Sequence, residues 1–304
     1  MRVEIEDDLD LDRIAASGQC FRWRRLADSS WLIPAFGTFV IVRQVSDSGR
    51  QEKKKQNNIS LYGGSVTLDL SCSPEEYEKI WAPYFDLNTS YRAIREMIDP
   101  ADAFLNAAAE AGRGIRILRQ DPFETLISFL ISQRKSIPAI QTAIERLCSV
   151  YGDPIGEAEG KKIFSFPSAE RLAAMECEKY GYGNVTGTCP YREKGIRSCG
   201  LGYRLPYIKR TAEFAASNPA AMSDFSALSD DGLKEALLSF YGVGIKVCSC
   251  TMLFGFHRLD AFPVDVWMKR ALAEHYPAGF DGERYRPYNG VMQQYMFAYY
   301  RSRN

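Results

Sequence analysis

The fold is decided by one stretch, Leu238-Ser-Phe-Tyr-Gly-Val-Gly-Ile-Lys-Val-Cys-Ser-Cys250, and by the segment that follows it, Phe262-Pro-Val-Asp-Val-Trp267. Lys246 stands two residues after Gly-Val-Gly, at the expected start of an apolar helix. Asp265 lies nineteen residues further on, after Phe-Pro-Val and before a second helical run. The pattern predicts a helix, a glycine hairpin and another helix, with a lysine and an aspartate in unusual local settings.

The hairpin is predicted from local physical chemistry. The first helix has apolar residues at helical spacing: Leu233, Ala236, Leu237 and Phe240. Gly242 and Gly244 allow positive φ and a close backbone approach. Amide groups at the start of the next helix point outward and form an anion site, which suits a phosphate. A helix C-cap followed by another helix is the plain alternative. Lys246, Cys250 and Pro-Val-Asp together favour the functional interpretation.

Length and composition limit the possible classes. The chain has 304 residues, enough for two domains, and its 46% hydrophobic and 25% charged residues are typical of a globular protein. No apolar run is long enough to span a membrane, and the N-terminus lacks the apolar core of a signal peptide. The eight cysteines are scattered, which favours reduced thiols over a disulfide framework. We therefore expect a cytoplasmic protein.

The formal net charge is zero, with 38 basic and 38 acidic residues, and gives no global support for nucleic-acid binding. A local basic face could still bind DNA. Basic residues gather in five short segments: 113–119, 134–135, 191–197, 204–210 and 269–270. Each segment alone is also consistent with a solvated surface.

The pattern predicts an α+β protein, with an antiparallel β domain over residues 1–105 and a helical region over 106–304. Strands are expected at 38–45 and, on either side of a Gly63-Gly64 turn, within 59–70, with an exposed loop at 46–58. Ser73 and Glu76 form a capping-box pattern, and Asp121 is placed to cap a helix. The irregular segment 175–200 contains three cysteines but no close Cys-x2–4-Cys pair, so a surface insertion is favoured over a zinc site.

Several separated segments resemble the 8-oxoguanine DNA glycosylase family of the helix-hairpin-helix glycosylases, and in particular its bacterial members. Besides the hairpin with Lys246, they are Ser17-Gly-Gln-Cys-Phe-Arg-Trp23, Tyr84-Phe-Asp-Leu87, Gly114-Ile-Arg-Ile-Leu-Arg-Gln-Asp-Pro122, Leu201-Gly-Tyr-Arg204, and Pro287-Tyr-Asn-Gly-Val-Met-Gln293 with Phe297. The resemblance implies an N-terminal antiparallel sheet on a two-lobed helical body. It also implies a bifunctional glycosylase and abasic-site lyase that acts on duplex DNA containing oxidised guanine at the bacterial nucleoid. A monomer is the default expectation.

The resemblance assigns residues to the flipped base. Gly18 would offer a backbone carbonyl to the N7 hydrogen that distinguishes 8-oxoguanine from guanine. Gln293 would bind the Watson–Crick edge with its paired donor and acceptor. Phe297, one helical turn on, would stack on one face of the base, and Cys250 on the other. Each of these residues could also be an ordinary core residue.

The resemblance also assigns DNA contacts. An extruded base leaves a gap in the duplex, and Tyr203 resembles the aromatic wedge that fills it. A helix-start packing residue is the plain alternative for Tyr203. Gln133 and Arg134 would lie beside the orphaned partner base, and Arg204 would donate to that base if it is cytosine. The hairpin with Gly242 and Gly244 would bind the sugar–phosphate backbone of the DNA.

The implied chemistry centres on two side chains. Neutral Lys246 attacks the sugar C1′ and forms a Schiff base, which permits β-elimination. Burial and a helix N-terminus would both favour the neutral amine. Asp265 would stabilise the positive sugar, or cap the helix that follows it. No cofactor is required, but the family's hairpin binds a cation. Its ligands here would be backbone carbonyl groups: Leu238, Phe240 and Val243.

Three departures from the family pattern concern specificity. Trp267 stands where eukaryotic members usually carry histidine, and Ala139 and Arg134 stand where those members use arginine and asparagine against cytosine. We therefore expect a relaxed opposite-base preference. No cysteine follows Cys250, so an iron–sulfur cluster of the endonuclease III type is not expected.

Three other functions fit parts of the pattern less well. An alkylation-damage glycosylase of the same superfamily typically lacks the hairpin lysine, so Lys246 argues against it. A non-catalytic DNA-binding module would not need both Lys246 and Asp265. A dinucleotide-dependent oxidoreductase is disfavoured, because Gly-Val-Gly is not preceded by a strand.

Overall fold

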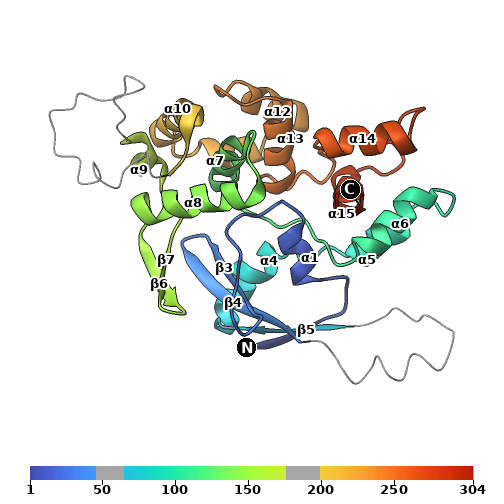
Figure 1. Ribbon diagram of the computed structural model, residues 1–304, viewed down its shortest axis with the longest axis horizontal. Coiled ribbons are helices and arrows are strands. Elements are labelled where there is room, and N and C mark those ends of the chain that lie inside the picture. Colours follow the sequence, from blue (N-terminus) through green and yellow to red (C-terminus); the bar gives the residue numbers. More distant parts are fainter. Residues whose placement is uncertain (46–64, 176–198, 304) are drawn as a thin grey trace. The chain divides into compact units, whose positions relative to one another are not determined.

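The computed structural model describes residues 1–45, 65–175 and 199–303 (Figure 1). The chain forms two compact units. Unit 1 comprises Met1–Ile33, Val40–Arg119 and Val264–Asn304, and unit 2 comprises Pro34–Phe39 and Gln120–Pro263. The domain boundary at residues 105 and 106 stays a prediction. The expected Gly63-Gly64 turn, the loop at 46–58 and residues 176–198 of the cysteine-containing segment lie outside the described residues.

The predicted antiparallel sheet is present, with strand order β1-β5-β4-β3-β2. Its strands are β1 (Arg2–Ile5), β2 (Arg24–Arg25), β3 (Trp31–Ala35), β4 (Thr38–Val45) and β5 (Val66–Leu70). Strand β4 has the predicted bounds, and its Val42 pairs with Leu70 of β5. Val40, Val42 and Leu68 are fully buried, so alternate residues supply the sheet's core face. The α+β prediction is confirmed.

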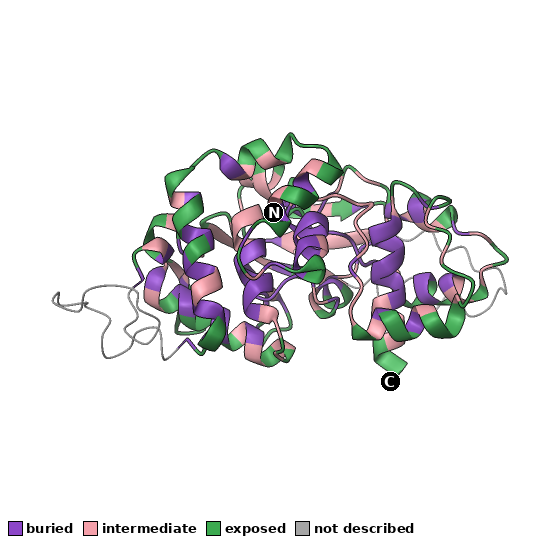
Figure 2. Ribbon diagram, turned by 90° about the horizontal axis from the view of Figure 1, so that it is seen from above, coloured by how far each residue is buried: buried purple, intermediate pink, exposed green. Residues whose placement is uncertain are grey.

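The helices of unit 1 come from both ends of the chain. They are α1 (Leu11–Ala16), α3 (Pro74–Glu76), the π-helical turn η1 (Tyr77–Trp81), α4 (Ala82–Tyr84), α5 (Tyr91–Glu96), α6 (Ala103–Ala111), α14 (Val266–His275) and α15 (Asn289–Arg303). The predicted capping box is confirmed, because Ser73 and Glu76 exchange two 3.1 Å hydrogen bonds. Helix α15 is buried over 289–296 and packs on α6 and α14 (Figure 2).

One arginine ties the segments of unit 1 together. Arg116 is fully buried, and its guanidinium lies 4.3 Å from the ring centre of Tyr91. It donates hydrogen bonds of 2.6–2.9 Å to Asp7 Oδ2 and to the backbone carbonyls of Asp8, Phe85, Asp86 and Thr89. Partial burial raises the pKa of Asp7, but donors from Arg92, Arg116 and Tyr91 outweigh it, and the net pKa is lowered. The segments around Tyr84 and Gly114 thus position each other.

Unit 2 is mainly helical. It contains α7 (Pro122–Ser132), α8 (Ile137–Tyr151), β6 (Pro154–Ala158), β7 (Lys161–Phe164), α9 (Ala169–Ala173), the 3-10 turn η3 (Gly202–Arg204), α10 (Leu205–Ser217), α11 (Ala221–Ser226), α12 (Asp230–Leu238) and α13 (Ile245–Phe254). Asp121 caps α7 as predicted, accepting from Glu124 N at 2.7 Å. Helix α13 packs on α7 and α12, and α10 packs on α9.

The β6–β7 hairpin was not predicted. Its turn is made by Glu159 and Gly160, which have φ values of 51° and 69°. Two consecutive positive φ values match the twist of a two-residue hairpin. In the described part of the chain, no helix is long and apolar enough to cross a bilayer.

Candidate active site

The predicted helix, hairpin and helix are all present in unit 2. Helix α12 ends at Leu238, α13 begins at Ile245, and the two helices pack together (Figure 1). The prediction that Phe240 belongs to the first helix is wrong. Phe240 follows the helix end, and its carbonyl accepts a 3.1 Å hydrogen bond from Val243 N that closes the turn. Phe240 is still buried, so it anchors the turn through its ring.

Lys246 occupies the second position of α13, where backbone amide groups lack intrahelical partners and the helix dipole is positive. Its side chain is exposed, so the expected burial of Lys246 is wrong. The neighbouring Ile245 is 73% exposed, which shows that the first turn of α13 faces outward. Of the two features expected to favour the neutral amine, only the helix N-terminus is present in the free chain.

Cys250 lies one turn after Lys246 on the same side of α13 and is buried. The lysine is therefore at the surface, and the thiol lies deeper along the same face of the helix. This places a small polarizable group below the amine, which is what the expected base contact requires.

Gly242 fits closely against a tyrosine of α10. Its φ is +89°, in the left-handed region that favours glycine. A Cβ at this position would lie 2.3 Å from Cγ of Tyr207, so the ring fills the space that a side chain would need. Gly244 differs, because its φ is outside that region and a Cβ there would meet nothing within 4 Å. The fold therefore requires glycine at position 242 but has room for a side chain at position 244.

We expect Gly242→Ala to lower the free energy of unfolding by about 2–4 kcal/mol, since it combines left-handed strain with overpacking. Gly244→Ala is the matched control and should change it by less than about 1 kcal/mol, because its site is open. Urea unfolding followed by circular dichroism measures both values. Equal losses for the two variants would show that the Tyr207 contact does not constrain the hairpin.

The expected DNA-contact residues of unit 2 converge beside the hairpin. Gln133, at the end of α7, donates from Nε2 to the carbonyl of Gly242 at 3.1 Å. Arg204 Nε donates to the carbonyl of Gln133 at 2.9 Å, and Nη2 donates to the same oxygen. Tyr203 is 43% exposed, and its ring lies 4.3 Å from the Arg204 guanidinium carbon. The wedge candidate Tyr203 thus projects from a protein segment that is held in place by hydrogen bonds.

Arg204 itself is buried, and Nη1 also donates to the carbonyl of Leu201 at 3.3 Å. Three of its five N–H groups therefore hold the local backbone. Arg134 is exposed and has a φ of 53°. Lys135 donates to the carbonyl of Gly200 at 3.0 Å, and desolvation followed by the charge of Arg204 lowers the pKa of Lys135. Cationic side chains therefore lie around the protein segment that carries Tyr203.

The carbonyl groups expected to hold a cation lie at the hairpin. Those of Leu238 and Val243 accept no hydrogen bond from the described residues, whereas that of Phe240 is already bonded to Val243 N. Two free carbonyl oxygens and a third with one lone pair remaining fit an oxygen-ligated cation.

The other expected site residues lie in unit 1, where Gly18 and Phe297 meet. Gly18 has a φ of +79°, and a Cβ there would lie 3.6 Å from Cε1 of Phe297. Its carbonyl accepts no hydrogen bond from the described residues. Gln19 fixes this segment by donating to Arg116 O and accepting from Leu118 N, both at 2.8 Å. A free carbonyl is thus held rigidly beside an aromatic ring.

Gln293 lies one turn before Phe297 on α15 and is 3% exposed. Its Oε1 accepts from Nε2 of Gln294 at 2.9 Å, which orients the amide. The Gln293 side chain donates no hydrogen bond to the described residues. Its NH2 group therefore remains available for a ligand.

Asp265, also in unit 1, is the N-cap of α14. Its Oδ1 accepts from Met268 N at 2.9 Å, so the capping interpretation is confirmed. Oδ2 accepts no hydrogen bond from the described residues, and the side chain is half-buried. Trp267 follows in the first turn, with the Arg270 guanidinium carbon 5.5 Å from its ring centre. Capping uses one carboxylate oxygen and leaves the other for a cationic partner.

Sequence reasoning missed two positioning residues. Tyr207 underlies the hairpin, and its spacing of four from Tyr203 was the available signal. Gln19 supports Gly18 through backbone groups that are 97 and 99 residues away in sequence, for which no local signal exists.

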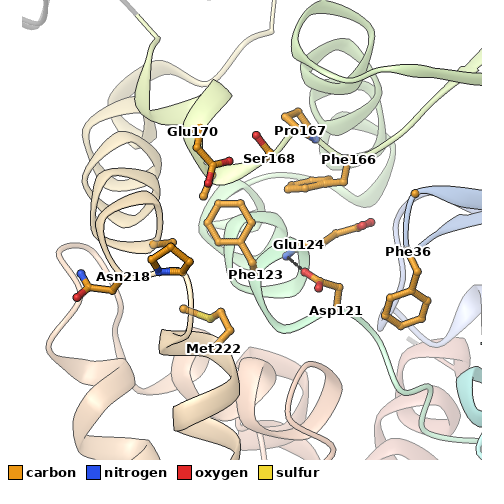
Figure 3. Close-up of a pocket in the computed structure, with 14 residues that line it drawn as sticks. Phe36, Asp121, Phe123, Glu124, Phe166, Pro167, Ser168, Glu170, Asn218 and Met222 are labelled. Carbon is orange, nitrogen blue, oxygen red and sulfur yellow. Dashed lines mark hydrogen bonds between the residues drawn. The ribbon is translucent and has the colours of Figure 1, made fainter.

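A hollow of about 410 Å³ in unit 2 contains none of the predicted site residues (Figure 3). Phe123 and Phe166 meet edge to face in it, with ring centres 6.4 Å apart. Asp121, Glu124 and Glu170 line it, and no lysine or arginine of the described residues does. Its carboxyl groups oppose binding of a phosphate backbone.

The chain is similar to known proteins over most of its length. Residues 2–126 match the family model for the N-terminal domain of 8-oxoguanine DNA glycosylase. A solved structure of MBOgg1 in complex with a low-affinity DNA ligand is 31% identical, with a TM-score of 0.80, and the match covers 99% of this chain and 96% of that one. The Clostridium acetobutylicum 8-oxoguanine glycosylase/lyase, in complex with double-stranded DNA containing cytosine opposite 8-oxoguanine, is 30% identical, with a TM-score of 0.79 and coverage of 100% and 98%.

The Saccharomyces cerevisiae N-glycosylase/DNA lyase is 29% identical over 299 residues, which cover 89% of this chain and 69% of the yeast protein. The 3-methyladenine DNA-glycosylase of Archaeoglobus fulgidus shares the fold, with a TM-score of 0.67 at 17% identity. Similarity at 30% or more over nearly the whole length, together with the N-terminal domain match, decides between these groups. The chain belongs to the 8-oxoguanine DNA glycosylase/lyase family.

Proposed function

We propose that this chain excises 8-oxoguanine from duplex DNA and then cleaves the strand at the resulting abasic site. The observation that carries the proposal is the position of Lys246. It stands at the second residue of α13, directly after the glycine hairpin, in a chain similar over its whole length to an 8-oxoguanine glycosylase/lyase.

Recognition of the base rests on three residues of unit 1. The free carbonyl of Gly18 accepts from N7–H of 8-oxoguanine, whereas guanine presents a lone pair there and is repelled. The buried amide of Gln293 binds the Watson–Crick edge, and the ring of Phe297 stacks on the base. The resemblance to the family implies that Cys250 contacts the other face of the base. The positive φ of Gly18 favours glycine, so we expect the direction of its carbonyl, and with it the selectivity, to depend on a glycine at this position.

The chemistry begins with the amine of Lys246, which attacks C1′ as the N-glycosidic bond breaks and the base departs with the bonding electrons. The free carboxylate oxygen of Asp265 stabilises the positive charge on the sugar. Loss of the amine proton and opening of the C1′–O4′ bond then give the Schiff base, and removal of a proton from C2′ breaks the C3′–O bond and expels the 3′ phosphate. Because Lys246 is exposed in the free chain, the bound nucleotide has to provide the cover that excludes water.

The partner is duplex DNA, bound by a chain that acts as a monomer. Tyr203 fills the gap left by the flipped base. The base that was paired with it then lies beside three residues: Gln133, Arg134 and Arg204. The hairpin glycines bring the backbone close to a phosphate. A cation held by the carbonyls of Leu238, Phe240 and Val243 would add positive charge there, and the chemistry itself requires no cofactor.

A 3-methyladenine glycosylase is the second candidate, because that group shares the fold. Lys246 distinguishes the two functions, since a hydrolytic glycosylase needs no amine nucleophile. Incubation with 3-methyladenine-containing DNA should release no base if the proposal is right.

Cleavage of duplexes with 8-oxoguanine opposite each of the four bases tests the proposal and its specificity. Ala139 has no polar side chain, and Arg134 is exposed without an ion pair among the described residues. Because each bidentate base contact is worth about 1–3 kcal/mol of discrimination, losing such contacts should keep the four rates within about tenfold. A sharp cytosine requirement would contradict the relaxed preference, and an undamaged strand in all four duplexes would refute the proposed function.

A further inference from the structure

A continuous row of aromatic rings and guanidinium groups connects the wedge to the hairpin in unit 2. Its members, in spatial order, are Arg204, Tyr203, Tyr207, Tyr241 and Arg210, here called the tyrosine row. The rings of Tyr203 and Tyr207 have centres 6.0 Å apart, and those of Tyr207 and Tyr241 are 5.1 Å apart at 82°. An arginine lies over each end ring, with its guanidinium carbon 4.3 Å from the ring centre.

The two arginines differ in what they bind. Arg204 is buried and donates to backbone carbonyls. Arg210 is exposed and forms no ion pair or hydrogen bond with the described residues. The nearby carboxylate of Glu213 is instead paired with Lys209, at 3.2 Å. The charge of Arg210 is therefore not neutralised locally, and its ring contact is with Tyr241.

Stacking prepares Arg210 for an anion. A guanidinium that lies over an aromatic face keeps the N–H groups at its edge free. The ring also restricts the rotamers of a long side chain, so less entropy is lost when the guanidinium binds a ligand. An exposed, oriented guanidinium with free edge donors fits the planar, bidentate recognition of a phosphate.

The position of Tyr241 indicates which phosphate. Tyr241 immediately precedes Gly242, and the same turn leads into the N-terminus of α13. Tyr241 is 52% exposed and Ile245 is 73% exposed, so large side chains on both sides of the hairpin face outward. Apolar surface with an unneutralised cation and no carboxylate in the row suits the sugar–phosphate backbone of DNA.

We propose that Arg210, held over Tyr241, contacts a DNA phosphate next to the segment that the hairpin binds, and so contributes to DNA affinity rather than to bond breaking. This inference rests on the proposed function, since it takes the wedge and the hairpin as the DNA-facing side of unit 2. Tyr241 acts as a positioning residue for Arg210, and Tyr207 links this pair to the wedge.

The test measures binding of the full chain to a duplex with 8-oxoguanine opposite cytosine, by fluorescence anisotropy over a series of KCl concentrations. Arg210→Gln should weaken binding about three- to tenfold at low salt and reduce the slope of log K against log salt by about 1. The loss should be similar on undamaged duplex, because a phosphate carries no lesion information. In single-turnover cleavage, Arg210→Gln should raise the half-saturating protein concentration and leave the plateau rate unchanged.

Lys161→Gln is the control, because Lys161 is an exposed cation on β7 of the same unit, without an ion pair among the described residues. It should keep the wild-type salt slope, and Arg210→Lys should keep most of it. Tyr241→Ala should weaken binding, and combining it with Arg210→Gln should add little, because both remove one interaction.

An unchanged salt slope in Arg210→Gln, or additive losses in the double variant, would overturn the inference while leaving the proposed function intact. A wild-type chain that neither binds nor cleaves the duplex would instead refute the proposed function. Thermal unfolding of each variant separates these outcomes from a folding defect.

Discussion

Replacing Lys246 by glutamine is expected to abolish the covalent adduct that borohydride traps between the chain and a duplex with 8-oxoguanine opposite cytosine. Borohydride reduces a Schiff base, and glutamine has no amine to form one. Base release should fall by at least roughly 10³-fold, since removing a nucleophile removes the reaction route itself. The fold should be unaffected, because the Lys246 side chain is exposed and makes no hydrogen bond to the residues that the structure describes.

The matched control is Lys234→Gln, which changes an exposed lysine in α12 of the same unit. It should give the wild-type amount of adduct. Denaturing gel electrophoresis of labelled DNA measures adduct and strand cleavage together. An adduct that persists in Lys246→Gln would show that another amine is the nucleophile. Intact binding with no adduct in the wild type would instead favour a hydrolytic or non-catalytic protein.

Features that depend on local sequence could be predicted. The capping roles of Ser73, Asp121 and Asp265 follow from a polar side chain placed before an apolar helical pattern, and all three are confirmed. The hairpin likewise follows from two glycines between two apolar helices. In each case the stabilising contact lies within a few residues along the chain, so the sequence pattern contains it.

Features that depend on distant contacts could not be predicted. Gly18 meets Phe297 from the other end of the chain, and Arg116 binds backbone carbonyls of residues 27 to 108 positions away. A periodic sequence pattern does not indicate which distant residues contact each other. The resemblance to a family assigned Gly18 and Phe297 to the flipped base, but neither their contact nor the hydrogen bonds of Arg116 were predicted.

The exposure of Lys246 shows a different limit. Apolar residues on both sides of it, Ile245 and Val247, favour burial of this turn. Val247 is 6% exposed but Ile245 is 73% exposed, because the first turn of α13 presents only one side to its neighbours. An apolar residue at a surface used for binding has the same sequence signature as one in a core.

Replacing Asp265 by asparagine is expected to separate its two roles. Asparagine caps helices about as well as aspartate, so the hydrogen bond to Met268 N should survive and unfolding free energy should change by less than about 0.5 kcal/mol. The negative charge is lost, and base excision should slow by roughly 10²- to 10³-fold, as when one stabilising group of a transition state is removed. Single-turnover base release and urea unfolding measure the two effects separately.

Asp265→Ala, set against Asp265→Asn, separates the cap from the charge. Alanine removes the cap as well as the charge, so it should cost about a further 1 kcal/mol of stability while slowing excision no more than asparagine does. Asp10→Asn is the control, since Asp10 caps α1 in the same unit and accepts from Arg13 N at 3.0 Å. It should leave excision unchanged. Full activity in Asp265→Asn would mean that the carboxylate serves the helix alone, because the cap is the one role that the amide retains.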